Sequence, residues 1–157
     1  MYRKDWIDKW AVYSPDKVAL KEYETGLEIT YKELNERANF LADWLINSKG
    51  FQKGDRLMVL AEHCIEYVAL FVCSQKTGII LVPVNYRLAP AEVDYLIKDS
   101  EPKFVLVEKK FEKLIEGTSH SMNHQWLEDL PKGTLSEFIS TELEEDDAVF
   151  ILYTSGS

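Results

Sequence analysis

The feature that most constrains the fold of this chain is an alternation of short apolar runs and helical stretches. Apolar runs at 56–61, 79–84 and 104–107 have the length and composition of buried strands. Helical periodicity fills the intervals at 64–77 and 90–99, and the first of these helices is apolar nearly all round. Strands that alternate with helices in this way form right-handed βαβ units. The chain is therefore predicted to be an α/β protein, with a mostly parallel sheet and helices on both faces.

Other elements are predicted on either side of this alternation. A short helix is expected over 5–13 and a hairpin over 18–31. Thr30 and Glu33 have the spacing of a capping box, which predicts that a helix begins there. Residues 117–133 are polar and lack any periodicity, which predicts a surface excursion.

The end of the sequence combines an apolar run with a small polar loop. Residues 148–153 are apolar, with β-branched and aromatic members, and predict a buried strand of the parallel sheet. Thr154, Ser155, Gly156 and Ser157 follow at once. Their hydroxyls, backbone N–H groups and glycine are typical of an anion-binding nest, and the usual ligand of such a nest is phosphate. The chain is therefore expected to stop inside a phosphate loop.

An ordinary turn is the alternative to a phosphate loop at this position. Thr, Ser and Gly are common in surface turns, and these residues taken alone favour a turn. The preceding strand favours a ligand site, because ligands gather at the carboxyl ends of strands in α/β sheets. The loop is not a Walker A loop, since the pattern Gly-x4-Gly-Lys-Ser/Thr is absent from the sequence.

The net charge and the two cysteines limit the partners and the cellular location expected of this protein. The net charge is −9, whereas nucleic acid and anionic membrane surfaces require a basic face, so neither partner is expected. The most apolar region, 64–84, contains Glu66 and Lys76 and is not expected to span a membrane. Cys64 and Cys73 form no CxxC pair and are predicted to be buried free thiols, which favours a cytoplasmic protein.

No catalytic or metal-binding constellation stands out. His120 and His124 have the spacing of helical metal ligands, but their surroundings predict a loop, so a solvated surface is favoured and no metal site is predicted. His63 has no evident nucleophile partner and is expected at a strand-to-helix turn. Tyr86 and Arg87 follow a predicted strand, and packing of their loop is favoured over a role in a pocket.

Several segments occur in an order that points to one family. They are Pro15-Asp16-Lys17-Val18-Ala19-Leu20, Tyr31-Lys32-Glu33-Leu34-Asn35-Glu36-Arg37-Ala38-Asn39, Lys53-Gly54-Asp55-Arg56, Lys76-Thr77-Gly78, Val82-Pro83-Val84-Asn85-Tyr86-Arg87-Leu88, Asp99-Ser100-Glu101-Pro102-Lys103 and Tyr153-Thr154-Ser155-Gly156-Ser157. In this order they resemble the N-terminal part of the AMP-forming acyl-CoA synthetases, whose superfamily includes amino-acid adenylation domains and beetle luciferases. The segment Asn85-Tyr86-Arg87-Leu88 resembles the acyl-CoA ligase branch more than the amino-acid-activating branch. Residues 108–146 carry none of the resemblance.

The resemblance implies a function for the parent protein and a role for the loop. Residues 1–157 would be the N-terminal portion of the adenylation domain, within a larger adenylate-forming fold. Such enzymes bind ATP with Mg²⁺ and a carboxylic acid, form an acyl-adenylate, release pyrophosphate and transfer the acyl group to coenzyme A. Thr154, Ser155, Gly156 and Ser157 match the family's phosphate loop and would hold the β- and γ-phosphates. The catalytic residues are expected in the missing C-terminal part, so this chain alone is expected to be inactive.

Alternatives to an acid:CoA ligase stay open at this point. The chain could be a non-catalytic structural module, or one that self-associates through a truncated face. It could also come from another adenylating enzyme, such as an amino-acid-activating domain, or from an unrelated nucleotide-binding α/β domain.

Overall fold

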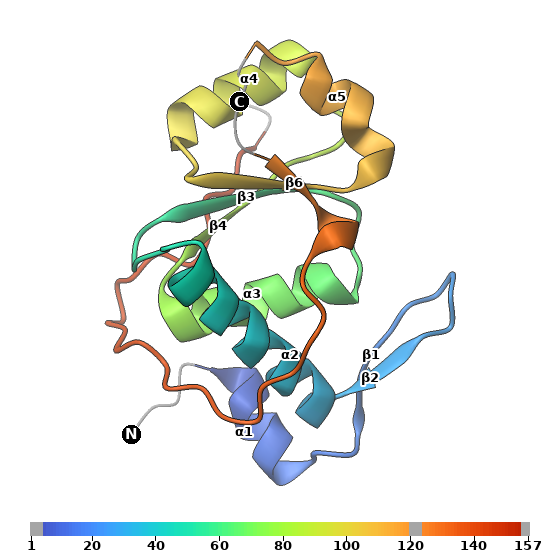
Figure 1. The fold of residues 1–157 in the computed structure, drawn as a ribbon, viewed down its shortest axis with the longest axis vertical. Coiled ribbons are helices and arrows are strands. Elements are labelled where there is room, and N and C mark those ends of the chain that lie inside the picture. Colours follow the sequence, from blue (N-terminus) through green and yellow to red (C-terminus); the bar gives the residue numbers. More distant parts are fainter. Residues whose placement is uncertain (1–4, 120–123, 155–157) are drawn as a thin grey trace.

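The central feature of the computed structural model, which describes residues 5–119 and 124–154, is a parallel sheet between two layers of helices. The sheet has the strand order β4-β3-β5-β6. Helices α4 and α5 cover one face, and α2 and α3 cover the other (Figure 1). The elements are α1 (Trp6–Tyr13), β1 (Val18–Lys21), β2 (Glu28–Thr30), α2 (Tyr31–Asp43) with a π-helical turn (Trp44–Ser48), β3 (Arg56–Leu60), α3 (Ile65–Thr77), β4 (Ile80–Pro83), α4 (Pro90–Ser100), β5 (Phe104–Val107), a 3₁₀ turn (Lys109–Phe111), α5 (Glu112–Glu116), β6 (His124–Trp126) and a second 3₁₀ turn (Leu127–Asp129).

Each face of the sheet has its own apolar core. In β3, Leu57 and Val59 pack with α2 and α3, whereas Met58 and Leu60 pack with α4 and α5. All of these side chains are fully buried, because successive residues of a strand point to opposite faces and both faces are covered. The prediction of an α/β fold with a mostly parallel sheet and helices on both faces is confirmed.

Helix α3 is buried on most of its surface and lies against both the sheet and α2. It ends at Gly78, which adopts the left-handed conformation with φ of 72° and donates its N–H to the carbonyl of Ser74. Within the part of the chain that the structure describes, this helix and all the others are too short or too polar to cross a bilayer.

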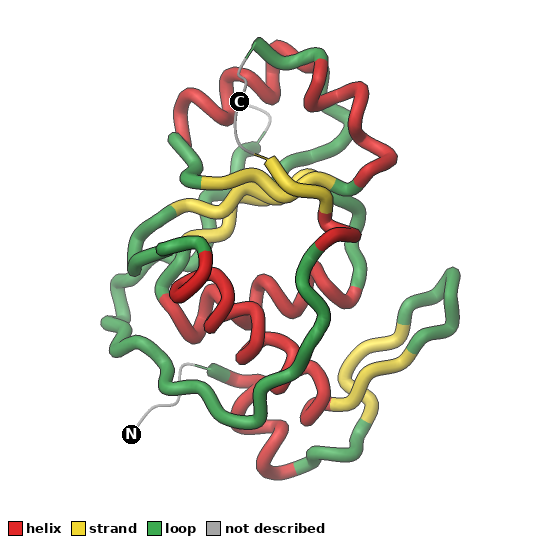
Figure 2. The backbone as a smooth tube through the Cα atoms, in the orientation of Figure 1, coloured by secondary structure: helices red, strands yellow, loops and turns green. Residues whose placement is uncertain are grey.

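Helix α2 begins at the predicted capping box. The Thr30 hydroxyl accepts a hydrogen bond from the Glu33 N–H at 3.3 Å, and the Glu33 carboxylate accepts one from the Thr30 N–H at 2.8 Å. The Thr30 hydroxyl also donates to Glu33 Oε2 at 2.8 Å. The hydrogen bonds that the Thr30 N–H and hydroxyl donate to the Glu33 carboxylate lower the pKa of Glu33. The box fixes the junction between β2 and α2. Ala19, Leu20 and Ile29 of the β1–β2 hairpin pack against the core beneath α2 and α3, while the tip of the hairpin projects from the rest of the fold (Figure 2).

Replacing Thr30 by alanine is expected to lower the free energy of unfolding by about 1 kcal/mol at neutral pH, because the hydroxyl satisfies a helix N-terminal donor. Since Glu33 has a lowered pKa in the folded protein, its contribution is present above the pKa of the unfolded chain and is lost as pH falls through the folded value. The difference between wild type and Thr30→Ala should therefore shrink in acid. Urea titrations at several pH values measure it, and Thr134→Ala, at an exposed position, is the control.

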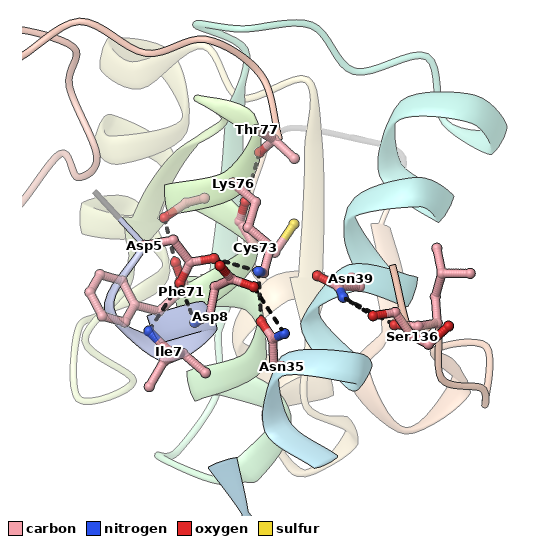
Figure 3. A network of polar contacts seen from close by, with 12 residues as sticks. Asp5, Ile7, Asp8, Asn35, Asn39, Phe71, Cys73, Lys76, Thr77 and Ser136 are labelled. Carbon is pink, nitrogen blue, oxygen red and sulfur yellow. Dashed lines mark hydrogen bonds and ion pairs between the residues drawn. The ribbon is translucent and has the colours of Figure 1, made fainter. Parts of the chain in front are cut away.

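A buried ion pair connects the start of helix α1 to helix α3. The Lys76 ammonium of α3 contacts the Asp5 carboxylate and donates a hydrogen bond to Asn35 Oδ1 of α2 at 2.7 Å (Figure 3). Asp5 also caps α1, since its Oδ1 accepts from the N–H groups of Ile7 and Asp8 at 3.0 Å. Three helices therefore meet at one lysine that is 2% exposed.

The stretch 117–133 departs from the expected surface excursion. Residues 124–126 form β6, which pairs in parallel with β5 at the edge of the sheet. Leu127 and Leu130 are buried in the core beneath α2 and α3. Residues 124–126 show no strand pattern in the sequence because an edge strand of three residues is too short to show a period.

The expectation of a buried strand over 148–153 is wrong in its burial. The segment lies outside β4 and makes a single parallel bridge, in which Leu81 donates to Val149 O and accepts from Ile151 N, both at 3.0 Å. Phe150 is 36% exposed and Leu152 is 66% exposed. An apolar run predicts a strand from its own residues, but its burial depends on elements that pack over it, and here few do.

Candidate functional site

The carboxyl ends of the parallel strands lie on the side of the sheet where the phosphate loop was predicted. Strand β3 ends at Leu60, β4 ends at Pro83, and the parallel segment beside β4 leads to Thr154. Thr154 is exposed at this carboxyl edge. The other predicted loop residues, Ser155, Gly156 and Ser157, lie outside the described residues. The structure thus describes the start of the predicted loop, at the position where α/β sheets bind ligands.

Two cavities flank the end of the final segment. The first has a volume of about 360 Å³ and the second about 580 Å³. The first is lined mainly by Ala61, His63, Tyr86, Arg87, Leu152 and Tyr153. The second is lined mainly by Asn85, Leu88, Tyr95, Leu96, Tyr153 and Thr154. Pro83, Asn85 and Tyr153 line both cavities, and the second cavity reaches the start of the predicted loop.

Tyr86 and Arg87 combine packing with a place in a cavity. The Tyr86 ring stacks on Phe111 with 5.0 Å between centroids, and the Arg87 guanidinium lies 5.8 Å from the Tyr86 ring centroid. Both residues also line the smaller cavity. Packing of the loop was the favoured prediction, and the structure adds that Arg87 places a cation beside the carboxyl edge.

The structure also places His63 and the two cysteines, Cys64 and Cys73. His63 lies between β3 and α3, as predicted, with its ring 5.5 Å from that of Tyr67. Both cysteines are free thiols, with Cys64 half-buried and Cys73 buried. Burial raises the pKa of Cys73 to about 12 and also raises the pKa of Cys64, so both are protonated at neutral pH.

Only one member of the histidine pair, His124, lies within the described residues. His124 lies in strand β6, and His120 lies outside the described residues. Among residues 5–119 and 124–154, no three His, Cys, Asp or Glu side chains are grouped closely enough to hold a metal ion.

A third cavity, of about 470 Å³, lies between the hairpin and the start of α3. Its carboxylates bind neighbouring groups: Glu22 accepts from the Ile65 N–H at 2.9 Å, and Lys110 bridges Glu62 and Glu108 at 2.5 and 2.9 Å. These interactions raise the pKa of Lys110. Because the polar groups satisfy one another, we assign this cavity a structural role.

One contact at the carboxyl edge was not anticipated from the sequence. The Tyr153 hydroxyl donates a hydrogen bond to Asp99 Oδ2 of α4 at 2.5 Å. A tyrosine that ends an apolar run has a polar tip in need of a partner, which is the only signal the sequence offered. The partner is far away in sequence and could not be identified without the fold.

Comparisons with known proteins agree with this architecture. The profile of the AMP-binding enzyme family matches residues 7–157. The 2-succinylbenzoate–CoA ligase of Oceanobacillus iheyensis is 32% identical over 152 residues, covering 97% of this chain and 31% of the ligase. The long-chain-fatty-acid–CoA ligase FadD13 of Mycobacterium tuberculosis is 30% identical over 164 residues, covering 94% of this chain and 31% of the ligase.

A solved structure extends the comparison to the fold. The N-terminal domain of FACL13 from Mycobacterium tuberculosis superposes with a TM-score of 0.85 at 28% identity, covering 99% of this chain and 42% of that domain. The chain therefore spans less than a third of the length of the two curated ligases. The match of the family profile over nearly all of its residues shows that the chain belongs to the AMP-binding enzyme family.

Proposed function

We propose that this chain is the N-terminal part of an AMP-forming acid:CoA ligase. The observation that carries the proposal is its relation to two curated CoA ligases over 94% or more of its length. In such a reaction the carboxylate of the acid attacks the α-phosphorus of ATP and displaces pyrophosphate. The thiol of coenzyme A then attacks the acyl-adenylate and releases AMP.

The role proposed for this chain in that reaction is to hold the leaving pyrophosphate. Thr154, with Ser155, Gly156 and Ser157, would donate hydroxyl and backbone N–H hydrogen bonds to the β- and γ-phosphates. Two features support this: Thr154 is exposed beside the 580 Å³ cavity, and Arg87 supplies a cation at the same edge. We expect Mg²⁺ to enter with ATP and assign it no ligand in this chain.

An ATP–pyrophosphate exchange assay tests the proposal. It is run with short, medium and long carboxylic acids and with amino acids, on this chain and on the same chain extended through its native reading frame. We expect exchange only in the extended protein, because this chain spans 31% of the length of each of the two curated ligases. Acid-dependent release of AMP that requires coenzyme A identifies a ligase, whereas exchange with amino acids alone identifies an amino-acid-activating enzyme.

Absence of exchange with every acid in the extended protein would overturn the proposal. It would favour a non-catalytic module that associates through the segment beside β4, where Phe150 and Leu152 are exposed. We further propose a cytoplasmic location, supported by the two free cysteines.

A further inference from the structure

The residue immediately before the predicted phosphate loop is fixed by its side chain. Tyr153 is the last residue before Thr154, and its hydroxyl donates to Asp99 Oδ2 at 2.5 Å. Asp99 lies in the last turn of α4, which packs through Val93, Leu96 and Ile97 against the sheet. The hydrogen bond therefore connects the start of the loop to a helix that is itself well supported.

The backbone of the same segment is fixed two residues earlier. Ile151 donates its N–H to the Leu81 carbonyl, and Leu81 donates to the Val149 carbonyl. Residues 152–154 make no backbone hydrogen bond to the rest of the described chain, so the direction in which they leave the sheet depends on side chains. Tyr153 is half-buried against the core beneath α4, whereas Leu152 borders the smaller cavity and is 66% exposed. Tyr153 is thus the side chain best placed to set that direction.

The chemistry of the pair keeps the tyrosine a donor. Burial and the nearby Asp99 carboxylate raise the pKa of Tyr153 to about 12, so its hydroxyl is protonated at physiological pH. Hydrogen bonds to a charged acceptor are also shorter and stronger than those between neutral groups. The side chain of Tyr153, which borders both cavities, is consequently held in one orientation by this hydrogen bond.

We propose that Tyr153 and Asp99 are positioning residues for ATP, because their hydrogen bond fixes where the phosphate loop begins. This inference rests on the proposed function, since it requires that Thr154 and the residues after it bind the β- and γ-phosphates. Neither side chain needs to touch the nucleotide. Their effect is to hold Thr154 in one place before ATP arrives, which lowers the entropy lost on binding.

The test compares four single variants and one double variant in the extended protein by ATP–pyrophosphate exchange and by thermal unfolding. Tyr153→Phe removes only the hydroxyl, and Asp99→Ala removes the acceptor. Each is expected to raise the KM for ATP about threefold to tenfold, as loss of one hydrogen bond predicts, while kcat and the KM for the acid stay unchanged. Asp99→Asn keeps an acceptor oxygen and should restore most of the ATP affinity. Tyr23→Phe, at a fully exposed hairpin position, is the matched control and should behave as wild type.

The double variant Tyr153→Phe/Asp99→Ala provides the decisive comparison. If the two residues act through one bond, the KM for ATP in the double variant should equal that of either single variant. An unchanged KM for ATP in Tyr153→Phe, alongside normal exchange in wild type, overturns the positioning role, even where the variant unfolds at a lower temperature. Failure of wild type to exchange with any acid overturns the proposed function first, and the positioning role with it.

Discussion

Replacing Asp5 by alanine is expected to lower the free energy of unfolding of this chain by about 3–5 kcal/mol. The reason is the environment of its partner, because Lys76 is only 2% exposed and would be left buried without its counter-ion (Figure 3). Asn35 would remain as an uncharged acceptor at 2.7 Å, which does not replace a carboxylate. The variant also loses the cap that Asp5 provides to α1. Chemical denaturation monitored by tryptophan fluorescence measures the loss.

Two further variants separate the buried pair from a general effect of removing an aspartate. Asp16→Ala removes an exposed carboxylate just after α1 and should change stability by less than about 0.5 kcal/mol. Asp5→Ala combined with Lys76→Met removes both charges and should recover part of the loss, because an apolar side chain of similar length suits a buried site. A loss in Asp5→Ala no larger than that in Asp16→Ala would contradict the importance of the pair.

Replacing Arg37 by alanine is expected to cost about 2–3 kcal/mol, because its side chain is the principal link between α2 and the return segment, residues 127–147. Arg37 is 8% exposed; its Nη2 lies 2.9 Å from Glu66 Oε2, and its Nη1 donates to Pro131 O at 2.7 Å and Gly133 O at 3.1 Å. The variant leaves these acceptors without their donor. Denaturation measures the stability, and limited proteolysis reports whether the return segment has become accessible.

Two matched substitutions show whether the stability that Arg37 provides comes from its hydrogen-bond geometry or from its charge. Arg37→Lys keeps the charge but cannot reach Glu66 and both carbonyls together, so it should recover little of the loss. Lys132→Ala removes an exposed charge from the return segment itself and should be close to neutral. Wild-type stability in Arg37→Ala, or full recovery in Arg37→Lys, would show that the hydrogen bonds to the carbonyls do not hold the segment.

The return segment leads directly into residues 148–154, so its path determines where these residues enter the candidate site. It leaves β6 at one edge of the sheet, crosses α2, and reaches the opposite edge beside β4 (Figures 1 and 2). Asn39 of α2 donates to Leu135 O at 3.0 Å, and Thr141 donates its N–H to Lys76 O at 2.8 Å. The segment is therefore attached to both helices of that layer, and the attachment fixes where residues 148–154 begin.

The sequence alone determined the parts of this protein that depend on local pattern. The capping box at Thr30, the helix apolar nearly all round at 65–77 and the apolar runs of β3, β4 and β5 each carry a signal within a few residues, because period and composition follow from which faces are covered. Ordered motifs likewise identified the family, since each one names residue types at fixed spacing. The position of the predicted loop after a parallel segment followed from the same logic.

Only the tertiary structure decided features that join distant parts of the chain. Nothing near Lys76 in sequence indicates that Asp5 neutralises it, and nothing near Tyr153 indicates Asp99. The three-residue strand β6 exists because β5 offers it a partner, and the run at 148–153 remains partly exposed because few elements cover it. Burial and strand pairing depend on two segments in contact. The local sequence of one segment therefore does not show which distant segment covers it or pairs with it.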